Sequence, residues 1–203
     1  MTIPGQDYIL KCTPLKNVKT ILDIGAGSGN ASKYFNSKGI KVTATTMNKK
    51  IFKHHSSIDG QLHVCDVESL PFEDGRFDAV WMSHVLEHTL NPGKALSEAR
   101  RVLHNNGWLF VCVPPYKPNV VGGHYMTGWS LGQLIYVLIV SGFNAKQGHF
   151  ITYKYNVCGF VKKSNLRLPK LKNAKGDIES LKGFWPIKAK HGFNGVIDKI
   201  NWI

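Results

Sequence analysis

The chain has 203 residues, of which 43% are hydrophobic and 19% are charged, a balance that is typical of globular proteins and excludes a disordered chain. A chain of this length forms one domain, or one domain with an appendage, and buries a full core without disulfides. The net charge of +13 is uneven: residues 1–100 hold 12 basic and 10 acidic residues, whereas residues 101–203 hold 14 and 3. The second half therefore indicates either an anionic partner, such as a phosphate, a nucleic acid or an acidic glycan, or only a soluble surface.

The four cysteines are scattered and form no CxxC pair: Cys12, Cys65, Cys112 and Cys158. This spacing argues against a disulfide framework and a structural zinc site, and it fits a reducing compartment. The N-terminus lacks the basic start and apolar run of a signal peptide, and the longest apolar run, Leu134 to Val140, is too short to span a membrane. We therefore expect a cytoplasmic protein.

Strands alternate with helices along most of the chain. Apolar and β-branched runs predict strands at residues 19–24, 40–46, 62–65, 77–82 and 108–113. Helices are predicted over residues 31–39, 49–57, 91–103 and 130–141. Two more strands, 145–152 and 156–162, follow without a helix between them. The order predicts an α/β fold: a doubly wound, mostly parallel seven-stranded sheet with helices on both faces and an antiparallel last strand, the final pair being an edge hairpin.

Residues 163–203 differ from the rest of the chain. Ten basic residues run from Lys162 to Lys199, both included, and residues 163–203 also hold Phe184, Trp185, Phe193 and Trp202. Because aromatic residues at this density are unusual in disordered chains, we expect an irregular arm that packs on the domain or on its substrate. The predicted division is therefore a domain of residues 1–162 and a basic, aromatic-containing arm of residues 163–203.

A glycine cluster, Gly25-Ala26-Gly27-Ser28-Gly29, follows the first strand and opens a helix. Glycines let a backbone turn tightly and approach a ligand closely, and a helix N-terminus offers free N–H groups. The spacing is GxGxG, not the GxGxxG of dinucleotide-binding proteins, and the GKS or GKT of a P-loop is absent. Without a ligand, the same cluster is a tight turn between strand and helix.

The segment ILDIGAGSGN resembles motif I of class I S-adenosylmethionine (SAM)-dependent methyltransferases. The blocks CDVESLPFEDGRFDAVWMSHVLEH and ALSEARRVLHNNGWLFVCVP are similar to the branch that includes the ubiquinone-biosynthesis methyltransferases. The resemblance covers roughly residues 19–114 and implies a Rossmann-like fold, SAM as the cofactor and methyl transfer as the activity.

The resemblance also implies roles for single residues in the glycine loop. Gly25, Gly27 and Gly29, with Ala26 between them, would lie under the amino-acid part of SAM. Asp23 would orient the ammonium group of SAM. A carboxylate at a strand end also suits the cationic sulfonium.

Further along the chain, Asp66 would accept a hydrogen bond from the adenine amino group, and the Val67 N–H would face the adenine ring. Ser83 and His84 would border the methionine end of SAM and the acceptor. These residues follow the third and fourth predicted strands.

The end of the second strand departs from the family pattern. The family usually carries an acidic residue there that holds both ribose hydroxyls, whereas this chain has Thr46, followed by Met47. A neutral hydrogen bond is about half as strong as a charge-assisted one. Weaker SAM binding, or a non-catalytic SAM-binding module, follows as an alternative.

His84, Glu87 and His88 also spell H-x-x-E-H, the inverted zinc-peptidase motif. On a helix, the two histidines would share one face and bind zinc, with Glu87 as the base. A further carboxylate ligand would come from Glu98, Asp177, Glu179 or Asp198. Because the motif lies within the methyltransferase-like block, we expect no metal there and keep a zinc hydrolase as a remote alternative.

The acceptor is expected above the carboxyl ends of the strands, next to the segment after the fifth strand. That segment holds Tyr116, His124, Tyr125 and Trp129 among glycines. Methyl transfer to a hydroxyl needs a base, so His124 is the first catalytic candidate, His84 the second and Tyr125 the third. We expect O-methylation of a small polar or anionic acceptor, such as a sugar or glycan precursor. RNA methylation or another N-methylation is the alternative, but no RNA-binding module is recognisable.

Overall fold

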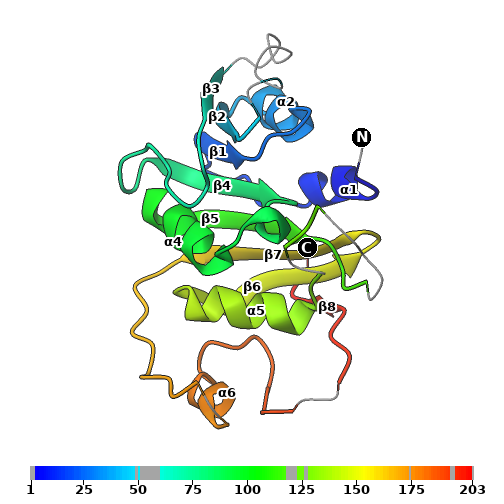
Figure 1. Cartoon of the computed structure of the whole chain (residues 1–203), viewed down its shortest axis with the longest axis vertical. Helices are drawn as coiled ribbons and strands as arrows, with labels where there is room; N and C mark the ends of the chain where they lie inside the picture. Colours follow the sequence, from blue (N-terminus) through cyan, green and yellow to red (C-terminus); the bar gives the residue numbers. More distant parts are fainter. Residues whose placement is uncertain are drawn as a thin grey trace.

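The computed structural model describes residues 3–48, 50, 60–117, 123–125, 128–173, 175–192 and 195–202. Most of the helix predicted over residues 49–57 lies outside the described residues. The described parts of the chain form one sheet, with helices packed on it and a long C-terminal arm beside it (Figure 1).

The sheet has eight strands in the order β3-β2-β1-β4-β5-β7-β6-β8. Their bounds are β1 Thr20–Ile24, β2 Lys41–Thr46, β3 Gly60–Val64, β4 Phe77–Ser83, β5 Leu103–Val113, β6 Phe143–Tyr153, β7 Asn156–Lys163 and β8 Lys199–Ile200. Strands β1 to β5 pair in parallel, whereas β7 pairs antiparallel with both β5 and β6. The predicted doubly wound α/β fold is thus confirmed.

Two details of the sheet differ from the sequence expectation. The strand count is eight rather than seven, because β8 of the arm adds two residues to the edge of β6. The second strand of the β6–β7 hairpin also does not lie at the edge of the sheet, because β7 inserts between β5 and β6. Strand β7 is buried from Asn156 to Val161, which explains the run without charged residues from Val157 to Val161.

The helices are α1 Gln6–Lys11, α2 Asn30–Ser37, η1 Leu86–His88, α4 Pro92–Val102, α5 Leu131–Val140 and α6 Asp177–Ser180. Helix α4 has Pro92 at its first position, and the Asn91 side chain accepts a hydrogen bond from the Lys94 N–H. Helix α5 begins with a capping box between Ser130 and Gln133. None of the described helices is long and apolar enough to cross a membrane.

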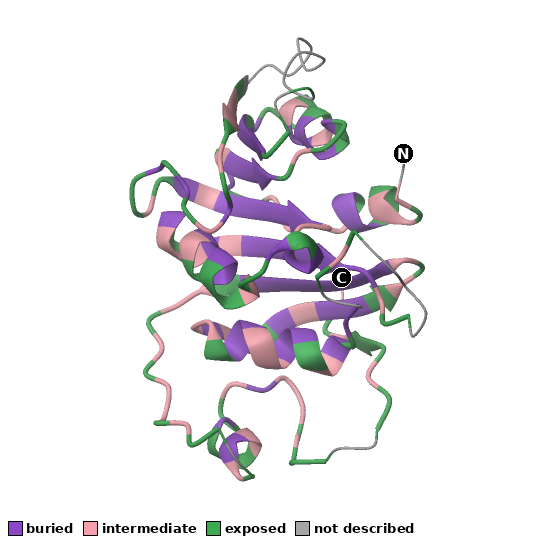
Figure 2. Cartoon of the chain, viewed as in Figure 1, coloured by how far each residue is buried: buried purple, intermediate pink, exposed green. Residues whose placement is uncertain are grey.

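Alternation along the central strands divides the core into two layers, one on each face of the sheet. On β4, Val80 and Met82 belong to the layer under α4 and α5, whereas Ala79 and Trp81 belong to the layer under α1 and α2. Strand β5 alternates in the same way. Figure 2 shows the resulting band of buried residues through the sheet.

The C-terminal arm contributes to the layer under α5. Leu181 is fully buried and Trp185 is 7% exposed, and both join that core layer. Two side-chain bonds hold the start of the arm: Lys163 Nζ donates to the Leu103 carbonyl at 2.6 Å and Arg100 Nη2 donates to the Ser164 carbonyl at 2.9 Å. The arm then returns to the sheet as β8 (Figure 1).

The sheet brings two of the scattered cysteines together. Cys112 of β5 lies opposite Cys158 of β7, and their Sγ atoms are 2.6 Å apart. Both thiols are free and buried. Burial raises the pKa of Cys158, so this pair behaves as part of the apolar core.

Candidate cofactor and acceptor site

The glycine loop lies at the end of β1, next to β2 and β4. Gly25, Gly27 and Gly29 have φ angles of 68°, 50° and 75°, in the left-handed region that side chains disfavour. A Cβ atom on Gly25 would also lie 2.6 Å from Val85 Cγ2. Only glycine therefore allows this loop to pass under the segment that follows β4.

Backbone bonds fix the loop against β2. The Ala26 N–H donates to the Thr45 carbonyl at 2.9 Å, and the Gly25 N–H donates to Thr45 Oγ1 at 3.3 Å. Gly29 is the N-cap of α2 and provides no side-chain cap. The loop is thus a rigid turn at a helix N-terminus, an arrangement that receives a polar ligand on its backbone.

Asp23 is 1% exposed at the end of β1 and accepts a hydrogen bond from Ser32 Oγ at 2.5 Å. Burial raises the pKa of Asp23 from its ordinary value of 3.8 to about 7, and the Ser32 hydrogen bond partly offsets this effect. A buried carboxyl group of this kind becomes ionised when a cation binds beside it.

Asp23 and the glycine loop line one cavity together with Trp81 and Ser83 of β4. Helix α1 adds Gln6 to the lining, where Gln6 Nε2 donates to Ser83 Oγ at 3.2 Å. This cavity contains the predicted residues Asp23, Gly25, Ala26, Gly27 and Ser83. The contribution of Gln6 had no signal in the sequence, because α1 carries no motif.

Thr46 is 5% exposed at the end of β2, and its Oγ1 accepts a hydrogen bond from the Asn48 N–H at 3.1 Å. The hydroxyl proton of Thr46 is therefore free to point to another acceptor. Met47 is 71% exposed. An exposed thioether next to the strand ends is a suitable apolar cover for a flat ring.

Asp66 and Val67 lie in the turn after β3. Asp66 Oδ1 accepts a hydrogen bond from the Glu68 N–H at 2.8 Å, and Val67 is 7% exposed. Arg101 of α4 fixes the chain after this turn, donating to the carbonyls of Leu70 at 2.9 Å and Phe72 at 2.6 Å. The turn is thereby held at the same edge of the sheet as the glycine loop.

His84 follows β4 with a φ of 57°, in the left-handed region. Its Nε2 lies 3.2 Å from Asn156 Oδ1, and its Nδ1 lies 3.2 Å from Glu87 Oε1. The Asn156 amide donates to the Pro4 carbonyl, which leaves its oxygen to face His84. Both ring nitrogens of His84 therefore lie close to oxygen atoms, those of Asn156 and Glu87.

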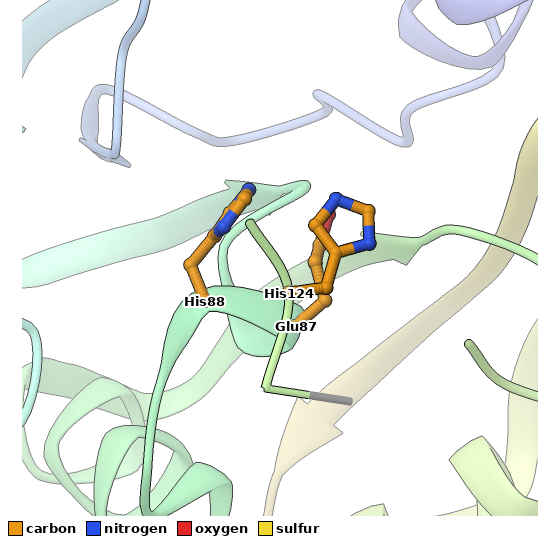
Figure 3. Close-up of side chains that lie close together, drawn as sticks. All are labelled: Glu87, His88 and His124. Carbon is orange, nitrogen blue, oxygen red and sulfur yellow. The ribbon is translucent and has the colours of Figure 1, made fainter. Parts of the chain in front are cut away.

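The structure does not place the H-x-x-E-H residues on one helix. His84 is left-handed, and only the three-residue 3-10 helix η1 follows it. The helix that the zinc-hydrolase alternative requires, with His84 and His88 on one face, is therefore not formed. Instead, Glu87 and His88 lie beside His124, which comes from the segment after β5 (Figure 3).

The segment after β5 divides between core and surface. Trp129 is 3% exposed and belongs to the core, so it does not line the acceptor side with the other aromatic residues as the sequence suggested. Tyr116 and Tyr125 are 62% and 68% exposed. The Tyr125 N–H donates to the Glu87 carbonyl at 2.8 Å, which places His124 and Tyr125 next to η1.

Comparison with known proteins agrees with this geometry. Residues 22–111 match the methyltransferase domain family, a range that runs from β1 to β5. The chain is 31% identical over 103 residues to the malonyl-(acyl-carrier protein) O-methyltransferase of Pseudescherichia vulneris, covering 50% of this chain and 41% of that protein. The chain thus spans about two fifths or less of the first curated relatives that it matches.

Two solved structures share the fold at 18% sequence identity. A SAM-dependent methyltransferase from Aquifex aeolicus superposes with a TM-score of 0.64, covering 79% of this chain and 93% of that chain. The 1,6-didemethyltoxoflavin-N1-methyltransferase of Burkholderia thailandensis superposes with a TM-score of 0.63, covering 80% and 77%.

The sheet order and the glycine loop agree with this match: residues 22–111 resemble the methyltransferase domain family, and the chain shares its fold with solved SAM-dependent methyltransferases.

Proposed function

We propose that this chain binds SAM at the carboxyl ends of β1 to β4 and transfers its methyl group to a small polar acceptor. The observation that carries the proposal is the buried Asp23 carboxyl group beside the glycine loop, in one cavity with Ser83. A buried carboxyl group that lacks a cationic partner among the described residues suits a ligand with an ammonium and a sulfonium group.

The proposed cofactor residues come from four strand ends and adjoin one edge of the sheet: Asp23, Gly25, Ala26, Gly27, Gly29, Thr46, Met47, Asp66, Val67, Ser83 and His84. Asp23 would hold the ammonium group, the Thr46 hydroxyl would donate to a ribose oxygen, and Asp66 would accept from the adenine amino group. The parallel strands support this proposal, because their carboxyl ends meet at one edge.

For the acceptor, we propose O-methylation of an anionic molecule such as a sugar or glycan precursor. The support is the basic second half of the chain and the imidazole groups beyond Ser83. His124 is the first proposed catalytic group at the acceptor, His84 the second and Tyr125 the third. His84 also lies close to Asn156 and Glu87. A cytoplasmic location belongs to the same proposal and is supported by four free cysteines.

A second candidate function is a SAM-binding module without turnover. It is favoured by Thr46, which replaces the acidic residue that the family usually carries at the ribose. Saturable SAM binding without methyl transfer to any acceptor class would identify this module.

The proposal is tested with methyl-labelled SAM and three separate acceptor pools: sugar phosphates, small carboxylic acids and short RNA oligonucleotides. We expect labelling in one of the first two pools and loss of that labelling in Gly25→Ala. Labelling confined to the RNA pool would overturn the proposed acceptor class and leave methyl transfer intact.

A further inference from the structure

Glu87, His88 and His124 form a compact cluster next to the proposed acceptor site. One ligand atom from each side chain lies within 4.8 Å of the others (Figure 3). Glu87 and His88 belong to η1, and His124 belongs to the segment after β5. Two imidazoles and one carboxylate are a common ligand set for divalent transition-metal ions.

Glu87 is the unusual member of the cluster. Its side chain is fully buried, and neither carboxylate oxygen has a hydrogen-bond partner among the described residues. His84 Nδ1 lies 3.2 Å from Glu87 Oε1, but the contact lacks hydrogen-bond alignment. Burying a carboxyl group without hydrogen bonds is costly, and a metal ion bound to Glu87 would offset this cost.

His88 is oriented as metal-binding histidines usually are. Its Nδ1 lies 2.6 Å from the Gly123 carbonyl oxygen, which can only accept a hydrogen bond. Nδ1 therefore carries the proton, and the lone pair of Nε2 is free for a ligand. A backbone carbonyl that fixes the tautomer in this way is a frequent second contact of metal-ligating histidines.

His124 is held next to η1 by its two neighbours in the chain. The bonds from His88 to the Gly123 carbonyl and from the Tyr125 N–H to the Glu87 carbonyl join both neighbours of His124 to η1. The rings of His88 and His124 meet edge to face, with centroids 4.8 Å apart. Nothing in the sequence predicted this contact, because residues 88 and 124 are far apart along the chain.

We propose that Glu87, His88 and His124 bind one first-row divalent transition-metal ion, such as Zn²⁺, Fe²⁺ or Co²⁺. Ligand atoms around such an ion are about 3–3.5 Å apart, given bonds of about 2.0–2.2 Å. The ligand atoms now lie within 4.8 Å of one another, so the exposed His88 ring and the half-buried His124 ring would move inward to reach this spacing. Imidazole ligands favour transition metals over Mg²⁺ or Ca²⁺.

Three protein ligands leave coordination positions open on the ion. In the proposed methyl transfer, an acceptor hydroxyl bound there would have a lowered pKa. That use rests on the proposed function, whereas metal binding itself does not. The two are therefore tested separately on the same preparation.

The test is a titration of metal-stripped, tag-free protein with Co²⁺, followed by visible absorption and by calorimetry. We expect one equivalent to bind to the wild type. The variants His88→Ala and His124→Ala should bind Co²⁺ at least ~10-fold more weakly, with unchanged circular dichroism. Glu87→Gln, which keeps the shape of the buried side chain, should show the same loss.

Two controls address other histidines. His104→Ala removes an exposed histidine elsewhere on the surface, and a His54→Ala/His55→Ala variant removes the only adjacent pair in the sequence. Both should bind Co²⁺ like the wild type. Unchanged binding in His88→Ala and His124→Ala, or equal affinity for Mg²⁺, would overturn the proposal. A SAM titration of each variant distinguishes failure of the metal-site proposal from failure of the proposed function.

Discussion

At the scale of single residues, Asp23 couples the cofactor cavity to pH. Because its pKa is raised from 3.8 to about 7, the native chain keeps a proton that the unfolded chain has already released between these values. The free energy of unfolding should therefore fall as pH rises from about 4 to 7 and then level off. A cation that binds beside Asp23 should bind more tightly as pH rises through 7.

The variant Asp23→Asn tests this coupling. This variant keeps an oxygen for the Ser32 hydroxyl but removes the buried charge. We therefore expect its free energy of unfolding, relative to that of the wild type, to rise by about 1–4 kcal/mol between pH 5 and pH 8. Urea unfolding at both pH values measures this difference. Parallel pH profiles for the two proteins would contradict the raised pKa.

Gly25 provides a second prediction at this scale. A methyl group there meets Val85 Cγ2 at 2.6 Å, and the left-handed φ adds about 1–2 kcal/mol of strain. Gly25→Ala should therefore displace the loop and abolish the rise in melting temperature caused by S-adenosylhomocysteine, the demethylated product of SAM.

Gly39→Ala is the matched control for this variant. Gly39 has a φ of 75°, and an added Cβ atom would meet nothing within 4 Å. Gly39→Ala therefore has the same backbone strain as Gly25→Ala but lacks the clash with Val85. Equal stabilisation of both variants by S-adenosylhomocysteine would argue against the glycine loop as its binding site.

At the scale of elements, α4 controls the turn that carries Asp66. Arg101 joins Glu98 and Asp74 by salt bridges of 2.7 Å and 2.8 Å, and it donates to two carbonyls of the loop before β4. Arg101→Met should cost about 1–3 kcal/mol and weaken SAM binding through the adenine side. The exposed Arg167→Met should change neither property, and equal effects of the two substitutions in urea unfolding and SAM titration would contradict the role of Arg101.

The helices and strands also show how much of the fold could be predicted from the sequence. The glycine loop and the strands β1 to β5 were predictable, because alternating strands and helices fix a parallel sheet and its ligand edge. The conformation of the turn after β4 was not predictable, because the letters H-x-x-E-H also fit a helix. The structure shows His84 in a left-handed conformation instead, with the partner of Glu87 and His88 coming from residue 124. Long-range contacts of this kind have no local signal.

At the scale of the whole molecule, we propose that the arm completes the domain. Leu181 is fully buried in the same core layer as α5, and β8 pairs with β6. Leu181→Ala should therefore lower the free energy of unfolding by about 2–4 kcal/mol in a single cooperative transition. A separate early transition of the arm, or a loss below about 0.5 kcal/mol, would show an appendage that does not share the core.

The central claim is that the cavity between the glycine loop, Ser83 and α1 binds SAM. Calorimetric titration of SAM into the purified protein tests it most directly. The account predicts one site with micromolar affinity, retained in Gly39→Ala and lost in Gly25→Ala. A folded wild-type protein that gives no binding, both alone and with the three acceptor pools present, would contradict the account.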